Sequence, residues 1–562
     1  MKSKETKSLT NDYFQSSFKW PNNGLRSYFG NVVKGQPDVW TVPTFASHFN
    51  PQLVLKRWSK DLEELNNEWP GLYSYEKEME AKVGPLSVRK PLKDRIGDID
   101  SYYEGVLPKV GEIWHPLDDE PIRQTLLEWK QAWGLRPRSQ EATVDKMQKS
   151  TNSGSPFFTK RKKVTLRTIP CETFPRNLGV VQLLHQRSKT REQNRKGKPR
   201  RLGSRNLSSS SYAAAAVLGW RGQEGGPTKE DVKQRVVWMF PYAVNVRELQ
   251  VYQPLIEAAQ RFNIVPAWVS MDKVDEEITA LFQTKSPEDL IVCTDFTAFD
   301  QHFNKFMQLA AKEVIRGILT ANAQTIEWLR EVFPVKYMIP LAYDINKVRF
   351  GEHGMGSGSG GTNADETLAH RCLQHSAAMY AGKALNPHSM CLGDDGILTF
   401  PGITESVVVA EYRRHGLEMN ESKQYSATDQ CIYLRRWHHE KYTHDGINVG
   451  VYPTTRALGR LMYTERYMDE DLWDPEAIVL RELSILENCK YHPMREQFAD
   501  FCIKWDKFKL GLAIPHFFED ISNVSKRVTA KIPDVMGYTK TMQADANSGV
   551  DSWWIVNYLR RK

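Results

Sequence analysis

The pattern of apolar and polar positions predicts a mixed middle section and a helical C-terminal section. Short apolar runs at residues 236–240 and 290–293 are bounded by polar residues, as is typical of buried strands. Two more short runs surround the sequence Gly-Asp-Asp-Gly at residues 393–396, which predicts a β-hairpin. A β-pair is expected over residues 337–350, and helical spacing predicts helices over residues 118–133, 305–319, 323–332, 362–381, 404–415, 472–489 and 494–508.

The first 110 residues lack a sustained period. Pro, Gly, Trp and charged residues alternate there, so we expect an irregular N-terminal extension with short helices, one of them over residues 53–67. The strands and helices of the middle section together predict the α+β class.

Composition excludes several classes of protein. The chain has 562 residues, 26% of them charged, and a mean hydropathy of −0.53. No apolar run approaches the ~20 residues of a membrane-spanning helix, and the first residues lack the apolar core of a secretory signal. Seven widely spaced cysteines without a CxxC pair argue against a disulfide scaffold or zinc ribbon and favour a reducing, intracellular setting. His370, Cys372 and His375 do not share one helix face, so we expect them to serve ordinary packing.

Positive charge is concentrated in one stretch. The net charge is +8, and residues 187–205 hold nine Lys or Arg against one acid, Glu192. A solvated loop or a nuclear-import signal would have the same composition. Such a cluster also binds phosphate backbones through counterion release. The candidates for this contact are Arg195, Lys196, Lys198, Arg200 and Arg201.

Acidic residues follow two of the predicted strands. Asp394 and Asp395 lie at the tip of the predicted hairpin, and Asp295 follows the run at 290–293. If the strands are neighbours, Asp295 faces Asp394 with Cβ atoms ~5 Å apart. Carboxylates this close repel each other unless divalent cations bind between them, and two ions ~3.5–4 Å apart support in-line phosphoryl displacement.

A Gly/Ser loop lies between these acidic sites. Residues 354–363 run into the predicted helix at Thr362 and contain a GxGxxG pattern. No strand ending in an acid follows about 20 residues later, which argues against dinucleotide binding. The loop and the helix N-terminus are suited to holding a nucleotide or a template backbone.

In this order the features resemble the palm of viral RNA-dependent RNA polymerases. Asp295-Phe-Thr-Ala-Phe-Asp300 resembles motif A, and Leu392-Gly-Asp-Asp395 resembles motif C. Two segments are most similar to picobirnavirus polymerases, with partitivirus polymerases next, and their sequences are DFTAFDQHF and GSGSGGTN. The other motifs are matched by Ser357-Gly358 with Thr362-Asn363 (B), Lys423 (D), Tyr433–Trp437 (E), Lys233-Gln-Arg235 (F) and Ser150–Pro156 (G).

The resemblance implies a closed right hand and templated attack of a 3′-hydroxyl on an NTP. The expected parts are an N-terminal extension (1–110), fingers (111–285 with an insertion at 305–350), a palm (286–304 and 351–445) and a helical thumb (446–562). Asp295, Asp394 and Asp395 would hold two Mg²⁺, for which Mn²⁺ can substitute, and Lys423 would be the general acid. The NTP would contact Lys233, Arg235, Asp300, Ser357, Gly358, Thr362 and Asn363, and the RNA would contact Ser153, Gly154, Pro156, Arg435, Arg436 and the basic stretch.

Partners implied by the resemblance are RNA template and product, NTPs and a viral capsid protein. The expected location is the host cytoplasm, inside the virion, with a double-stranded RNA genome. One departure concerns Glu366, which stands where many plus-strand virus polymerases carry Asn, so Asn363 is the alternative ribose contact. The rival functions are a reverse transcriptase, which normally has an aromatic residue where Asp300 stands, and a non-catalytic RNA-packaging protein.

Overall fold

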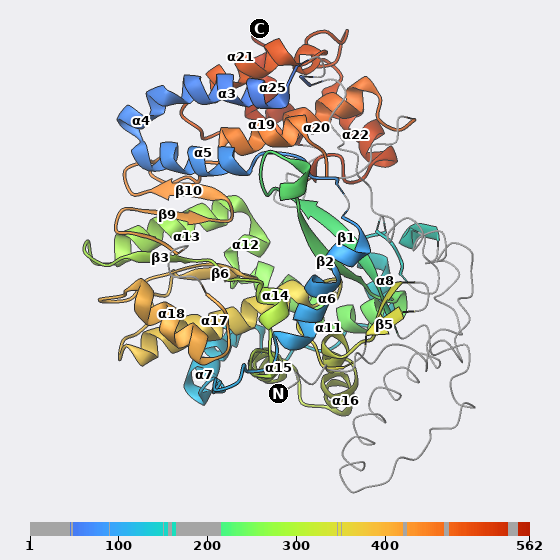
Figure 1. Cartoon of the computed structure of the whole chain (residues 1–562), viewed down its shortest axis with the longest axis vertical. Helices are drawn as coiled ribbons and strands as arrows, with labels where there is room; N and C mark the ends of the chain where they lie inside the picture. Colours follow the sequence, from blue (N-terminus) through green and yellow to red (C-terminus); the bar gives the residue numbers. More distant parts are fainter. Residues whose placement is uncertain are drawn as a thin grey trace, which may run out of the picture.

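The structure is a computed structural model of the chain. It describes residues 45–46, 49–88, 90–149, 151–154, 160–163, 215–344, 347–349, 351–419, 424–465, 471–537 and 549–562. Two sheets occupy the middle of the molecule, and a layer of helices lies beyond one end of them (Figure 1). The mixed α+β class is therefore confirmed.

The central sheet carries the predicted hairpin. Its strand order is β6 (Met390–Leu392), β7 (Asp395–Leu398), β3 (Ile291–Thr294) and β8 (Tyr425–Ala427), and every pairing is antiparallel. The expectation that Asp295 faces Asp394 was wrong. β3 pairs with the second hairpin strand, β7, with Thr294 opposite Gly396. The next step along these strands brings Asp295 beside Asp395, because Asp394 lies in the turn.

Helices bury both faces of the central sheet. Val292 and Leu398 face a core that includes α17 (Thr362–Tyr380) and α18 (Glu405–Arg414). Ile291 and Ile397 point the other way and pack against α13 (Met271–Thr284). The first core also contains residues of α7 (Asp119–Glu128), α11 (Tyr242–Arg261), α14 (Phe299–His302), α15 (Lys305–Ile318) and α16 (Ala323–Glu331). Strands buried on both sides read as continuous apolar runs, which is why residues 290–293 were predictable.

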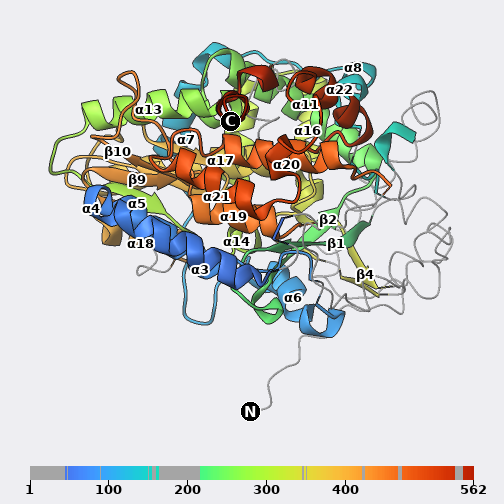
Figure 2. The same ribbon diagram turned by 90° about the horizontal axis from the view of Figure 1, so that it is seen from above.

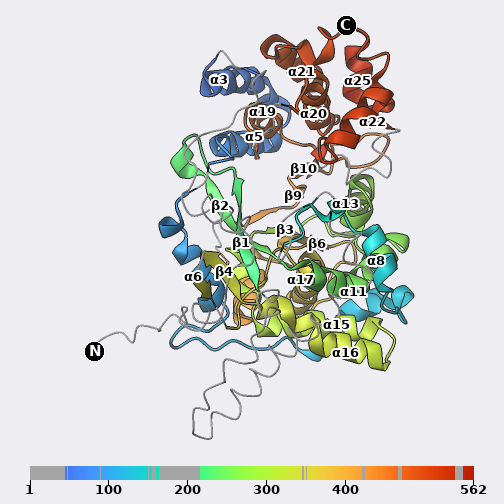
Figure 3. The ribbon, with the colours of Figure 1, turned by 90° about the vertical axis from the view of Figure 1, so that its right-hand side faces the viewer.

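A second sheet stands beside the first. Its strand order is β2 (Lys233–Met239), β1 (Ala216–Gln223), β4 (Leu341–Asp344) and β5 (Lys347–Arg349). The β1–β2 hairpin extends toward the helical layer (Figure 3). The predicted strand at 236–240 and the predicted β-pair are confirmed. The short helix α6 (Ile96–Glu104) packs on this sheet, α8 (Gln140–Lys146) contacts α11, and α12 (Pro266–Val269) precedes α13.

The helical layer combines both ends of the chain. The N-terminal helices α3 (Pro51–Asp61), α4 (Leu65–Glu68) and α5 (Pro70–Lys82) share one apolar core with the C-terminal helices (Figures 1 and 2). The C-terminal helices are α19 (Thr454–Met462), α20 (Pro475–Glu487), α21 (Arg495–Trp505), α22 (Ile521–Lys531) and α25 (Trp554–Leu559). A short hairpin, β9 (Gln430–Tyr433) and β10 (Arg436–His439), connects this layer to the central sheet.

One buried carboxylate joins the two ends. Glu76 on α5 accepts hydrogen bonds from the backbone N–H groups of Thr454 and Thr455, at 2.7 and 2.9 Å, and so caps the start of α19. The Nε2 atom of His492 lies 2.9 Å from the same carboxylate. The N-terminal helices are thus an integral part of the helical layer. Of the helices that the structure describes, none is long and apolar enough to cross a membrane.

Candidate active site

A cavity of about 580 Å³ opens between the central sheet, the β1–β2 hairpin and the helical layer. Asp295, Asp394 and Asp395 line it from the central sheet. Cationic side chains line it from the other elements, and these are Lys82, Arg221, Arg235, Arg435, Arg436, Arg456, Arg460 and Lys490. Acidic side chains lie there too, and two of them, Glu224 and Glu465, pair with Arg221, Arg456 and Arg460. Carboxylates facing cations across a cavity suit a polyanionic ligand that arrives with divalent cations.

The negative charges of Asp295 and Asp394 act on Asp395. Burial raises the pKa of Asp395 to about 7, and the negative charges of Asp394 and Asp295 act in the same direction. Arg435 and the backbone N–H of Leu434 oppose that rise. The backbone of Asp295 is held by Gln424, whose amide bonds its N–H at 2.9 Å and its carbonyl at 2.8 Å.

His370 supports both acidic strand ends from α17. Its Nδ1 lies 2.9 Å from the carbonyl oxygen of Gly393, and its Nε2 lies 3.4 Å from the hydroxyl of Thr294. Burial lowers the pKa of His370 to about 4, so the ring is neutral at physiological pH. His370 and Cys372 are buried, as expected for packing, whereas His375 lies 2.8 Å from Glu128. The sequence did not indicate that the packing of His370 lies directly beneath the carboxylates.

The three carboxylates offer only oxygen ligands, which Mg²⁺ and Mn²⁺ prefer. The raised pKa of Asp395 comes first from burial and then from the charges of Asp394 and Asp295, and a bound cation would offset those charges. Within the described part of the chain, no three acidic, thiol or imidazole groups are already close enough together to hold a metal ion. The residues therefore fit a site completed by substrate phosphates, the way Mg²⁺ is usually bound.

A second pair of acids lies deeper. Asp300, in the first turn of α14, shares a hydrogen bond with Glu366 on α17. Burial raises the pKa of both groups, and the charge of Asp300 raises that of Glu366 further. Arg235 acts in the opposite direction on Asp300. Asp300 and Arg235, both NTP contacts that the resemblance implies, therefore interact electrostatically.

The Gly/Ser loop packs tightly on β2. The hydroxyl of Ser357 donates to the carbonyl of Val236 at 3.2 Å, and a Cβ at Gly358 would lie 1.6 Å from the carbonyl of Trp238. Only glycine fits at that approach. Thr362 donates to the loop carbonyls of Gly356 and Ser359, each at 3.3 Å.

Asn363 and the two hairpin arginines have specific partners. The amide oxygen of Asn363 accepts a hydrogen bond from Trp268 Nε1 at 2.8 Å. Arg435 reaches the cavity from the left-handed turn between β9 and β10, where its φ is 65°. Arg436 is held by Asp275 at 3.1 Å and by the carbonyl of Gly450 at 2.7 Å. Arg436 therefore also anchors this hairpin to α13.

Three other predicted contacts that the structure describes, Ser153, Gly154 and Lys233, do not line the cavity. Ser153 is buried, and Gly154 packs against the residue after β2, where an added Cβ would lie 2.0 Å from the carbonyl of Phe240. Lys233 is exposed on β2, two residues before Arg235. The predicted residues Pro156, Arg195, Lys196, Lys198, Arg200, Arg201 and Lys423 lie outside the described residues.

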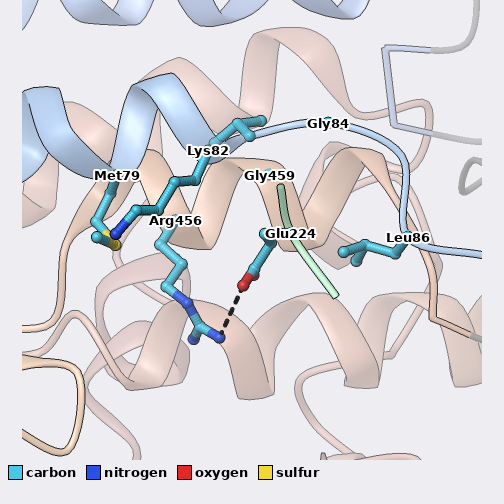
Figure 4. Close-up of a pocket in the computed structure, with 8 residues that line it drawn as sticks. Met79, Lys82, Gly84, Leu86, Glu224, Arg456 and Gly459 are labelled. Carbon is cyan, nitrogen blue, oxygen red and sulfur yellow. Dashed lines mark hydrogen bonds and ion pairs between the residues drawn. The ribbon is translucent and has the colours of Figure 1, made fainter. Parts of the chain in front are cut away.

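Sequence reasoning missed the side of the cavity formed by the helical layer. Tyr75, Glu78 and Lys82 on α5 line it together with Arg456 on α19. Figure 4 shows the adjoining small pocket, where Arg456 bonds Glu224 of the segment after β1 at 3.3 Å. These contacts join residues far apart in the chain, and no local pattern marks them.

Comparisons with known proteins agree with this geometry. The family profile described as viral RNA-dependent RNA polymerase matches residues 224–463. A protein of human picobirnavirus (strain Human/Thailand/Hy005102/-), named potential RNA-dependent RNA polymerase, is 50% identical over 551 residues, which are 97% of this chain and 98% of that protein.

Two crystal structures are also similar. The RNA-dependent RNA polymerase of a human picobirnavirus has 49% identity and a TM-score of 0.85, with 99% of each chain covered. The insertion-loop deletion mutant of such a polymerase has 49% identity and a TM-score of 0.82, and the match covers 96% of this chain and 97% of that one.

Proposed function

This chain belongs to the viral RNA-dependent RNA polymerases, and we propose that Asp295, Asp394 and Asp395 form the catalytic centre of its RNA-templated RNA synthesis. The observation that carries the assignment is the convergence of these carboxylates on one cavity that Arg235 and Arg435 also line. His370 supports the strand ends from below, which fixes the carboxylates before substrate binds.

Asp295 and Asp394 would hold two Mg²⁺, with Asp395 in a supporting role and with Mn²⁺ able to substitute. When bound, such ions lower the pKa of the attacking hydroxyl and neutralise the triphosphate. Arg235 and Lys233 offset the charge that develops on the phosphates. Lys423 donates a proton to the departing pyrophosphate.

Residues around the carboxylates would contact the sugar, the nucleotide and the RNA. Asp300 accepts a hydrogen bond from the ribose 2′-hydroxyl, directly or through Asn363. Ser357, Gly358 and Thr362 shape the loop on which the nucleotide rests. The RNA contacts Arg435, Arg436, Ser153, Gly154, Pro156 and the basic stretch, in which Arg195, Lys196, Lys198, Arg200 and Arg201 bind phosphates.

We also propose the division of the chain into an N-terminal extension (1–110), fingers (111–285 and 305–350), palm (286–304 and 351–445) and thumb (446–562). The pairing of β4 with β1 in one sheet supports joining the 305–350 insertion to the fingers. The shared core of α3, α5 and the C-terminal helices supports a functional link between the extension and the thumb. The further proposed partner is the viral capsid protein, and the proposed location is the host cytoplasm, inside the virion.

The rival reading is a reverse transcriptase. Asp300 argues against a reverse transcriptase. A carboxylate at this position can accept a hydrogen bond from the ribose 2′-hydroxyl, whereas the aromatic residue usual in reverse transcriptases excludes that hydroxyl. The test is incorporation of rNTPs and of dNTPs by the purified chain on unprimed single-stranded and double-stranded RNA. We expect labelled product with rNTPs, and product with dNTPs alone would contradict the proposal.

A further inference from the structure

The Gly/Ser loop between β5 and α17 contains no helix or strand of its own. Its first half is held by backbone groups of other elements. The N–H of Gly356 donates to the carbonyl of Lys336 at 3.2 Å, and the hydroxyl of Ser357 donates to the carbonyl of Val236 at 3.2 Å. The conformation of the loop therefore depends on what surrounds it.

One side chain holds the second half of the loop. Glu248, on α11, accepts a hydrogen bond from the hydroxyl of Ser359 at 2.7 Å through Oε1. Its Oε2 accepts the backbone N–H of Gly360 at 2.9 Å. The Ser359 hydroxyl oxygen in turn accepts the N–H of Gly361 at 3.0 Å. A single carboxylate thus fixes three consecutive residues just before α17 begins.

Glu248 is fully buried, with an exposed fraction of 0%. Burial raises its pKa, while the charge of Lys336 and the bonds from Ser359 and Gly360 lower it. Lys336 is also 0% exposed, and its Nζ lies 3.1 Å from Asp365 on α17. A buried carboxylate contributes little stability beyond that of a well-packed apolar side chain. What distinguishes Glu248 from an apolar side chain is that it accepts hydrogen bonds from Ser359 and Gly360 of the loop.

The same carboxylate is linked to residues 151–154, which belong to the motif G segment Ser150–Pro156, a predicted RNA contact that we call the template loop. With its amide nitrogen toward Glu248 Oε2 (3.2 Å) and its amide oxygen toward Arg161 Nη2 (3.0 Å), Asn245 bridges the two charges. The backbone N–H of Arg161 donates to the carbonyl of Thr151 at 2.9 Å, three residues before Gly154. A continuous series of bonds thus runs from residues 151–154 to the Gly/Ser loop.

We propose that Glu248 is a positioning residue that holds the Gly/Ser loop in its nucleotide-binding form and, through Asn245 and Arg161, couples that form to the template loop. The proposal rests on the proposed function of this site. If the loop is released, only part of the population is competent to bind, so the apparent affinity falls by that fraction. Coupling between two sites also makes their effects on binding interdependent.

The test uses two mild variants of the full-length chain, Ser359→Ala and Arg161→Gln, and their combination. The quantities measured are KM for NTP, apparent Kd for template RNA, kcat and thermal midpoint. We expect Ser359→Ala to raise KM for NTP at least about fivefold while kcat changes less than about twofold, because the bond acts on the binding-competent form. We expect Arg161→Gln to weaken template binding at least about fivefold, because it releases residues 151–154 from the network and so lowers the fraction competent to bind.

The combination measures the coupling. We expect its effect on KM for NTP to differ from the product of the single effects by at least about threefold, as for residues within one network. Glu248→Gln, which keeps one acceptor oxygen, should retain more NTP affinity than Glu248→Ala. The matched control is Glu257→Gln, on the same helix but paired with Arg138 and with Lys146 at 2.8 Å on the side of α8, and it should leave KM for NTP, Kd for RNA and kcat unchanged.

Two outcomes would overturn the proposal. Variants that lower the thermal midpoint while both affinities stay within about twofold would make the network structural only. If the change in KM for NTP in the double variant equals the product of the two single changes, the two sites are not coupled. A wild-type chain that incorporates no rNTP would instead refute the proposed function, so the two failures are distinguishable.

Discussion

The carboxyl groups of Asp300 and Glu366 share a hydrogen bond inside the site. Such a bond requires a proton on one of them, because ionised carboxylates only accept. The pKa of Glu366 is raised well above its ordinary value by burial and by the charge of Asp300, so Glu366 carries the proton. A protonated Glu can donate as the amide of Asn does. We propose that Glu366, which stands where many plus-strand virus polymerases carry Asn, supplies that donor in this chain.

The first prediction concerns sugar choice. Asp300→Ala should lower use of rNTPs and narrow the rNTP/dNTP preference by at least about tenfold, about 1.4 kcal/mol. A site built to bond a hydroxyl discriminates strongly against the deoxy analogue. The measurement is incorporation efficiency of GTP and dGTP opposite one template base. Glu366→Gln keeps a donor toward Asp300, so it should retain most of the preference.

A simple capping role for Asp300 makes the opposite prediction. In the structure the N-cap of α14 is Ala298, and no side chain caps this helix. If Asp300→Ala lowered stability but kept the wild-type sugar preference, Asp300 would be a structural residue and not a sugar reader.

The second prediction concerns His370. His370→Phe keeps a ring of similar size but removes the bonds to Gly393 and to Thr294. We expect kcat to fall at least about tenfold, because displaced carboxylates misplace the reacting groups. We expect a stability loss of about 1–2 kcal/mol from the buried carbonyl left unpaired. His370→Gln can still donate to Gly393 and should recover part of kcat, which separates positioning from packing. Equal kcat in both variants and the wild type would contradict this role.

The third prediction concerns pH and stability. Burial alone would raise the pKa of Glu76, but the bond and charge of His492 and the bonds from Thr455 hold it below 4.5. A lowered folded pKa contributes stability that is present above the unfolded value and is lost as pH falls through the folded value. Glu76→Gln should therefore cost about 3 kcal/mol near pH 7.

The difference between wild type and Glu76→Gln should shrink as pH falls below about 4.5, because the wild-type carboxyl is then neutral too. Urea unfolding at several pH values measures it. A difference that does not depend on pH would mean that the charge of Glu76 contributes nothing.

The fourth prediction concerns the basic stretch, which lies outside the described residues. Neutralising Arg195, Lys196, Lys198, Arg200 and Arg201 together should weaken RNA binding and flatten its salt dependence, since the slope scales with the number of phosphates neutralised. Fluorescence titrations at several salt concentrations measure the slope. An unchanged slope would identify the stretch as a solvated surface loop.

Local sequence patterns predicted much of this fold, and the failures have a physical reason. Residues 362–381 and 390–400 were predictable because periodicity and turn residues are local signals. The pairing of β3 with β7 was not, because periodicity carries no information on which strands are neighbours. The same holds for Glu76 and Thr454, which meet although 378 positions separate them.

The candidate site was predictable where a motif marks it. Asp295, Asp394 and Asp395 converge on one cavity, as expected. Glu248 and Lys82 belong to no motif, and only the packing of α11 and α5 brings them to the loop and the cavity.

The most direct test of the catalytic assignment is the rate of templated rNTP incorporation by Asp394→Asn. The substitution keeps the size and turn preference of the side chain but removes one charge, so we expect folding stability to be nearly unchanged. Asp395→Asn should lower the rate of rNTP incorporation less than Asp394→Asn does. The control is Asp289→Asn, which preserves the acceptor for the N–H of Gly402 outside the cavity and should keep wild-type activity. We predict near-complete loss of incorporation for Asp394→Asn, and retention of more than roughly a few per cent of the wild-type rate would contradict its role as a metal ligand.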